Sequence, residues 1–148
     1  MSDNREAFAD LLRQRRVDPV DPRAELALAL LGDGHQPLAT IADEVALLLR
    51  WEPSHGVAAP WGRRAIDALR EAIREAPELT VEAAAFAVER AGRLGGLGRQ
   101  AVGHAARLAL TGRSRGPDLA RLIVVLGRDE AARRLDRALA LRPLERLG

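Results

Sequence analysis

Apolar residues recur along this chain at helical spacing, and most of them are leucine and alanine, which favour α-helix. β-Branched residues are few, so little of the sequence suits strands. Capping residues, glycines and prolines divide the apolar segments into pieces of ordinary helix length. We therefore predict an all-α fold, a helical bundle of about seven helices.

Helix starts and stops can be read from capping pairs and breakers. The expected N-caps are Asp3, Asp21, Thr40, Thr80 and Asp129. Gly112 and Gly127 are expected to end the helices that precede them. The helical segments expected on these grounds are 3–16, 22–32, 40–50, 61–76, 80–93 and 99–110, followed by a segment from Gly116-Pro117 to Leu126 and one from Asp129 to Leu141.

The length of 148 residues is near the commonest size of one domain. The stretch Glu75-Ala76-Pro77-Glu78 breaks the helical pattern near the middle of the chain. We expect two subdomains, an N-terminal one over residues 1–76 and a basic C-terminal one over residues 77–148.

Several function classes lack the residues that they need. The chain has no cysteine, which excludes disulfides, thiol nucleophiles and thiolate zinc sites. It has no lysine, so no Walker-type phosphate loop is present. The three histidines, His35, His55 and His104, are far apart and none has a metal-ligand spacing. The sequence thus predicts a non-enzyme with no metal and no cofactor.

The location of the protein is expected to be cytoplasmic. No apolar run approaches the roughly 20 residues that span a bilayer. The first ten residues mix acids, a base and short apolar stretches, unlike a signal or transit peptide.

Charge is distributed unevenly, although the net charge is only +2. Residues 1–89 carry 10 arginines and 16 acids, whereas residues 90–148 carry 13 arginines and 5 acids. The segment 90–115 contains six arginines, one histidine and no acid. A basic segment of this kind indicates an anionic partner, of which nucleic acid is the leading class.

Helical spacing places Arg99, Gly103 and Arg107 on one face of the helix expected over 99–110, with Gln100 and His104 beside them. Arginine offers bidentate hydrogen bonds to phosphate, and a glycine between two arginines lets a ribose-phosphate approach closely. The same pattern also fits a solvated face of a protein that uses arginine in place of lysine. For Trp51, Trp61, Phe8 and Phe86, core packing is favoured over base stacking.

The segment Arg107–Leu119 reads RLALTGRSRGPDL and so contains R-x-A-L-T-G followed by P-x-L. It resembles a segment near the C-terminus of bacterial glutamyl-tRNA synthetases. Downstream, LGRDE at 126–130, then RL at 134–135 and AL at 138–139, resembles the closing L-G-(K/R)-(D/E)-E…R-L…A-L helix of the same family. More loosely, the likeness extends over nearly the whole chain.

In that family this region is the all-helical, cage-like anticodon-binding part, whereas amino-acid activation lies in an upstream Rossmann domain with HIGH and KMSKS signatures. Neither signature occurs in this sequence. The resemblance implies a stand-alone, non-catalytic tRNA-binding module that binds the anticodon arm of glutamate tRNA in trans. The partners that it implies are a catalytic synthetase domain or a biosynthetic enzyme that uses charged tRNA, and no membrane.

The resemblance also implies where RNA is bound. The family's turn around G-x-P-x-L contacts anticodon nucleotides, and the N–H groups of the helix that follows can meet phosphate or base acceptors. With the acid-free segment added, the expected nucleic-acid-binding residues are Arg99, His104, Arg107, Thr111, Arg113, Arg115, Gly116, Pro117, Asp118 and Leu119.

One departure from the family's pattern affects specificity. Family members carry an arginine, which reads an anticodon base, three residues before the Thr-Leu pair that Thr40-Ile41 matches in this chain. The residue at that position is Pro37, and proline cannot donate a hydrogen bond, so His35 and Gln36 would have to replace the arginine. The alternative function is a repurposed protein–protein interaction module that has lost RNA binding and docks a partner on its acidic half.

Overall fold

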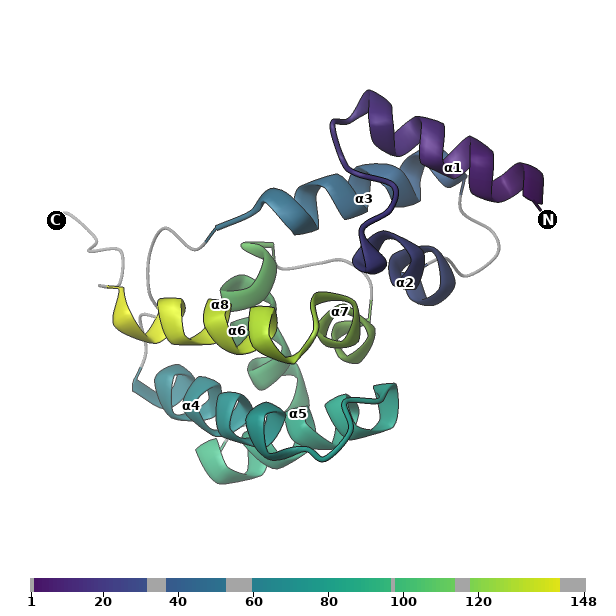
Figure 1. Cartoon of the computed structure of the whole chain (residues 1–148). Coiled ribbons are helices and arrows are strands. Elements are labelled where there is room, and N and C mark those ends of the chain that lie inside the picture. The colour runs from purple at the N-terminus through teal and green to yellow at the C-terminus, as the bar shows by residue number, and fades with distance from the viewer. Residues whose placement is uncertain (1, 32–36, 53–59, 97, 114–117, 142–148) are drawn as a thin grey trace, which may run out of the picture. The chain divides into compact units, whose positions relative to one another are not determined.

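The computed structural model describes residues 2–31, 37–52, 60–96, 98–113 and 118–141, with the side chains of all of these except 2, 3, 60, 61 and 99. These ranges form eight α-helices and no β-strand (Figure 1), which confirms the all-α expectation. The helices are α1 (Ser2–Gln14), α2 (Pro22–Leu31), α3 (Leu38–Arg50), α4 (Pro60–Glu75), α5 (Val81–Gly95), α6 (Arg99–Thr111), α7 (Leu119–Leu126) and α8 (Arg128–Ala140).

Four of the expected capping residues act as the sequence indicates, and one of them is Gly127, which ends α7 as its C-cap. Asp21 precedes α2, and its carboxylate accepts a hydrogen bond of 2.9 Å from the backbone N–H of Arg23. The Thr80 hydroxyl accepts one of 3.0 Å from the backbone N–H of Ala83 at the start of α5. Gly112 ends α6 in the left-handed conformation, with φ of 70°.

Three expected boundaries near the N-terminus are wrong. Helix α1 begins at Ser2, so Asp3 lies inside it instead of capping it. Helix α1 ends at Gln14 because Arg16 has a left-handed φ of 60°, which a helix cannot contain. Helix α3 begins at Leu38, so Thr40 lies inside it. The N-cap is Pro37, whose carbonyl oxygen accepts a hydrogen bond of 3.0 Å from the backbone N–H of Thr40.

Later boundaries differ for similar reasons. Helix α5 continues to Gly95 and ends with Gly96 in the left-handed conformation, because a glycine inside a helix weakens it without ending it. Helix α8 begins at Arg128 with Gly127 as its N-cap, so Asp129 lies in the first turn instead of capping it. The start expected at Gly116-Pro117 falls outside the described residues, and the N-cap of α7 is Asp118.

The chain forms two compact units, residues 1–51 with α1–α3 and residues 52–148 with α4–α8. This division differs from the expected one into residues 1–76 and 77–148. Helix α4 belongs to the second unit because it packs against α5, α6 and α8, and the break between α4 and α5 is only a turn within that unit (Figure 1). None of the described helices is long and apolar enough to cross a membrane.

Each unit has its own apolar core. In the first unit, α1 and α2 each pack against α3, and Phe8, Leu12 and Val45 are buried. In the second unit, the apolar stripe of α4, Ile66, Leu69 and Ile73, is buried completely, as its helical spacing indicates. Burial of side chains of this size stabilises the fold by about 1.5–3 kcal/mol each.

Phe86 is not a core residue, so the expectation of core packing is wrong for this aromatic. Its side chain is 58% exposed, whereas Ala84, Ala87 and Ala91 form the buried stripe of α5. A residue two positions after Ala84 points away from the core face, because successive helix positions are about 100° apart. Phe8 is buried as expected, and the side chain of Trp61 lies outside the described residues.

Helices α4 and α5 approach closely where Gly95 faces Ala65. A Cβ atom added to Gly95 would lie 3.1 Å from the Ala65 Cβ and 3.3 Å from its backbone nitrogen. Gly103, in the middle of α6, differs: a Cβ there meets nothing within 4 Å.

Replacement by alanine should therefore have opposite effects on the free energy of unfolding at Gly95 and at Gly103. Gly95→Ala should lower the free energy of unfolding by about 1 kcal/mol, because the backbone of α4 cannot move away without separating the helices. Gly103→Ala should raise it by about 0.5–1 kcal/mol through helix propensity. Urea denaturation followed by circular dichroism measures both, and two shifts of the same sign would contradict this packing.

Arginine and glutamate side chains of α8 link distant parts of the second unit. Arg134 is only 1% exposed, its Nε donates to Glu130 at 3.0 Å, and its Nη1 donates to the backbone carbonyl of Leu110 in α6 at 2.8 Å. Arg133 pairs with Glu130 and also with Glu52 at 2.7 Å. The i,i+4 spacing of Glu130 and Arg134 predicts an ion pair on the solvated side of the last helix. The pair forms, but its expected placement is wrong because Arg134 is buried against α6.

These ion pairs predict loss of stability in acid. Hydrogen bonds from Arg133 and then Arg134 lower the pKa of Glu130 to about 2. This shift corresponds to at most about 3 kcal/mol of stabilisation, and solvent screening reduces it to about 1–2 kcal/mol. The contribution is complete above the ordinary pKa of a glutamate and is lost as the pH falls towards the lowered value. Urea titrations at several pH values should show it in the wild type and not in Glu130→Gln; identical acid profiles of the two would contradict the prediction.

Candidate nucleic-acid interface

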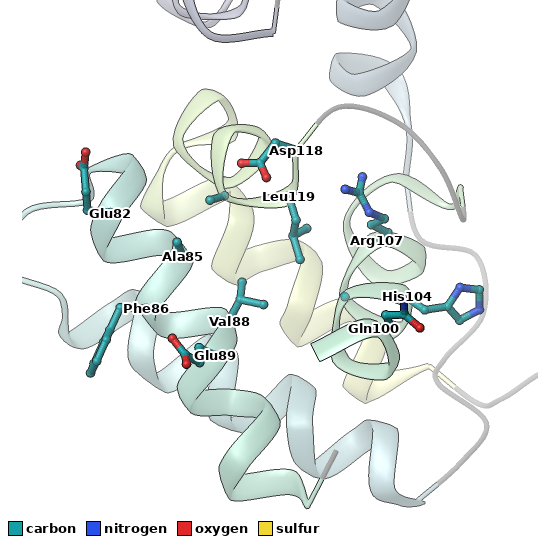
Figure 2. Close-up of a pocket in the computed structure, with 12 residues that line it drawn as sticks. Glu82, Ala85, Phe86, Val88, Glu89, Gln100, His104, Arg107, Asp118 and Leu119 are labelled. Carbon is teal, nitrogen blue, oxygen red and sulfur yellow. The ribbon is translucent and has the colours of Figure 1, made fainter. Parts of the chain in front are cut away.

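Three helices of the second unit, α5, α6 and α7, enclose an open groove of about 1130 Å³ (Figure 2). Helix α6 forms one wall with Gln100, Gly103, His104 and Arg107. The first turn of α7 closes one end. Two members of the expected binding face of α6, Gly103 and Arg107, therefore line one groove, while the side chain of Arg99 is outside the described residues.

The side chains of Arg107 and His104 on α6 point in different directions. In Figure 2 the guanidinium of Arg107 points towards the end of the groove where α7 begins, whereas the ring of His104 extends away from α5. Gly103 presents no side chain, so the middle of this wall is open. Of the expected residues on α6, Arg107 is best placed to meet a ligand in the groove.

The end of α6 explains the R-x-A-L-T-G pattern in structural terms. Leu110 is fully buried. The Thr111 hydroxyl donates to the backbone carbonyl of Arg107 at 2.8 Å and accepts from the backbone N–H of Arg113 at 3.2 Å. Gly112 then turns the chain in the left-handed conformation. Thr111 thus shapes the turn with its hydroxyl, and Arg113 follows it on an exposed position.

The P-x-L pattern lies at the other end of the same connection. Asp118 is the N-cap of α7, and its carboxylate accepts from the backbone N–H of Arg121 at 3.3 Å. Leu119 is buried except for 7% of its surface and also lines the groove. Because Asp118 is negative, it partly neutralises the positive end of the α7 dipole. The expected residues Arg115, Gly116 and Pro117 lie outside the described residues.

The two motif segments of the sequence meet in the fold. Arg134 of α8 donates to the carbonyl of Leu110, one residue before Thr111. Arg128 donates to the carbonyl of Arg74 at 2.9 Å and so ties the start of α8 to the end of α4. Helix α8 therefore holds the carboxyl end of α6, from which Arg107 enters the groove.

The opposite wall of the groove, on α5, contains Glu82, Phe86 and Glu89. Among the described residues of the lining, three are carboxylates, Glu82, Glu89 and Asp118, and one is a guanidinium, Arg107. A basic segment of sequence is thus faced by an acidic wall. No group of three His, Cys, Asp or Glu side chains in the described part of the chain is arranged to hold a metal ion.

The sequence prediction of the binding site does not include α5, because Glu82 and Glu89 come before the acid-free segment 90–115. The tight turn at Gly96 folds α5 back along α6 and brings the acids opposite the basic helix. One pattern could have shown this wall: Glu82, Phe86 and Glu89 recur at spacings of four and three, on the side of α5 away from Ala84, Ala87 and Ala91.

Comparison with known proteins agrees with this fold. A family model for an anticodon binding domain matches residues 7–139. No curated protein matches the sequence. A solved glutamate tRNA ligase from Elizabethkingia meningosepticum CCUG26117, in complex with its amino acid, is similar with a TM-score of 0.75 and 21% identity, over 95% of this chain and 29% of that one. For a glutamate-tRNA synthetase from Elizabethkingia anophelis the TM-score is 0.70 and the identity 21%, over 93% and 28% of the two chains.

The chain therefore spans less than a third of the length of these two proteins, and at such identities the likeness shows the fold. The family match is independent of that likeness and covers most of the sequence, including both motif segments. This chain belongs to the anticodon binding domain family.

Proposed function

We propose that this chain binds tRNA without catalysing aminoacylation, and that its ligand is the anticodon arm of glutamate tRNA, bound in trans in the cytoplasm. The observation that carries the proposal is the match to an anticodon binding domain over residues 7–139. The fold that it shares with two glutamate tRNA ligases supports glutamate tRNA over other tRNAs. The HIGH and KMSKS signatures of amino-acid activation are absent from the sequence.

The charge of the second unit supports RNA as the ligand. The six arginines of segment 90–115 provide bidentate donors for phosphate oxygens, and no carboxylate in that segment opposes them. Phosphate contacts of this kind position an RNA, while contacts to base edges select its sequence. We assign the contacts to Arg99, His104, Arg107, Arg113, Arg115 and the turn Gly116–Leu119, with Thr111 shaping the turn.

A module of this kind acts with a partner that supplies catalysis. We propose as partners a catalytic synthetase domain or an enzyme that consumes charged tRNA. The exposed Pro37 replaces a donor at the start of α3, so discrimination at one base is expected to be weaker than with arginine, by up to about 1–3 kcal/mol.

Calorimetric titration with two RNA hairpins tests the proposal. One hairpin carries the anticodon stem and loop of glutamate tRNA, and the other carries the same stem with the loop bases permuted. Tighter binding of the first is the expected result. Equal binding of both would indicate a general RNA-binding protein, and absence of binding would favour the alternative of a protein–protein interaction module.

Gly103 provides a sharper test of the groove itself. Leucine at this position would project from the open middle of the α6 wall into the groove without meeting other atoms at its Cβ. We expect Gly103→Leu to weaken binding of the glutamate hairpin at least about tenfold while leaving the protein at least as stable as the wild type, since leucine is a better helix former than glycine. Gly103→Ala is the matched control and should bind nearly as the wild type does; equal affinity of the leucine variant would place the RNA elsewhere.

A further inference from the structure

The α5 wall of the groove suits a nucleobase better than a phosphate. Glu82 and Glu89 repel a phosphate group, because like charges in one groove raise the free energy of the complex. The same carboxylates are acceptors for the amino groups that some bases carry on their edges. An RNA that lies in this groove therefore has its backbone on the Arg107 side and its bases towards α5.

Phe86 provides a surface for such a base. Phe86 is 58% exposed, and it is one of the four aromatic residues in the chain. Every base has a π-face, and unpaired bases in single-stranded RNA stack on exposed aromatic side chains. Phe86 lines the groove, and in Figure 2 its ring lies on the side of α5 away from α6, so a base that extends from the groove past α5 can reach the ring.

Glu89 lies one helical turn after Phe86, and Figure 2 shows the two side chains as neighbours on α5. Residues three apart on a helix have Cβ atoms about 5–6 Å apart, which is close to the width of a pyrimidine ring. A base stacked on Phe86 can thus present its edge to the carboxylate of Glu89. This carboxylate accepts from the N4 amino group of cytosine, whereas the O4 atom of uracil is an acceptor and is repelled.

We propose that Phe86 and Glu89 form a base subsite that binds an unpaired cytosine in preference to uracil. The inference rests on the proposed function, since it requires that RNA enters the groove. It adds a wall of the site that neither the motif segments nor the basic segment of the sequence includes.

Fluorescence anisotropy with two labelled RNA hairpins tests the subsite. The hairpins have the same stem, and their loops, of equal length, consist of cytosines only or of uracils only. We expect the wild type to bind the cytosine loop about tenfold more tightly. Glu89→Gln should abolish this preference, with uracil-loop affinity unchanged or higher because a negative charge is removed. Phe86→Ala should weaken both complexes about tenfold.

The control for charge is Glu78→Gln, which removes an exposed carboxylate that does not line the groove. It should leave the preference for cytosine intact. Equal affinity of the wild type for the two loops, or a preference that Glu89→Gln leaves unchanged, would overturn the subsite while RNA binding itself stands. Failure of the wild type to bind either of these hairpins at low salt, while it still binds the hairpin of glutamate tRNA, would also overturn the subsite. Failure to bind the glutamate hairpin as well would overturn the proposed function.

Discussion

Replacing Arg134 by methionine is expected to lower the free energy of unfolding by about 3 kcal/mol. The side chain of Arg134 is 1% exposed, and burial lowers the pKa of its guanidinium while Glu130 opposes that effect. Methionine keeps most of the apolar volume, so the substitution removes mainly the polar contacts. It leaves the carbonyl of Leu110 and one side of Glu130 without their donor.

Chemical denaturation in urea measures this loss. Arg137→Met is the matched control, because Arg137 is an exposed arginine of the same helix and its replacement should change the free energy of unfolding by less than about 0.5 kcal/mol. If Arg134→Met is as stable as the wild type, apolar contacts of the methionine compensate for the lost ion pair, as happens in some proteins. That result would also contradict the conclusion that α8 fixes the carboxyl end of α6.

Changing Arg107, Arg113 and Arg115 together to glutamine is expected to weaken binding of glutamate tRNA about 100-fold at moderate salt. The reason is counterion release: each phosphate contact that is lost removes attraction and makes the salt dependence shallower. The slope of log affinity against log salt concentration should therefore fall in magnitude by about 2–3. Anisotropy titrations at several salt concentrations provide both quantities.

A variant with Arg5, Arg13 and Arg50 changed to glutamine is the matched control, because it has the same net charge and its substitutions lie on exposed positions of the first unit. It should retain most of the affinity. Equal losses in the two triple variants would mean that only overall charge attracts the RNA, and would contradict the assignment of the contacts to the second unit.

Much of the helical architecture could be predicted because the information is local. Asp21 and Thr80 cap helices through bonds to backbone N–H groups two or three residues away, so their effect is visible in sequence. The stripe of Ile66, Leu69 and Ile73 is buried for the same reason: helical spacing puts these residues on one face of α4. The resemblance to glutamyl-tRNA synthetases adds the placement of the R-x-A-L-T-G segment in an anticodon-binding fold.

What could not be predicted depends on contacts between helices. From its i,i+4 spacing to Glu130, Arg134 is expected on the solvated side of α8. That it donates to the carbonyl of Leu110 follows only from the packing of α6 against α8. Glu89 is likewise an ordinary surface acid until α5 packs against α6 and Glu89 becomes part of the lining of the groove between them. The division of the chain after residue 51 also depends on packing, since it follows from the contacts of α4.

The most direct test of tRNA recognition by this chain is the binding of the wild type to three tRNA transcripts, for glutamate, glutamine and an unrelated amino acid, each at two salt concentrations. Fluorescence anisotropy gives the affinities. We expect the glutamate transcript to be bound most tightly and its affinity to fall steeply as salt increases. Absence of binding to all three transcripts at both salt concentrations would contradict the proposed function and would favour a protein partner.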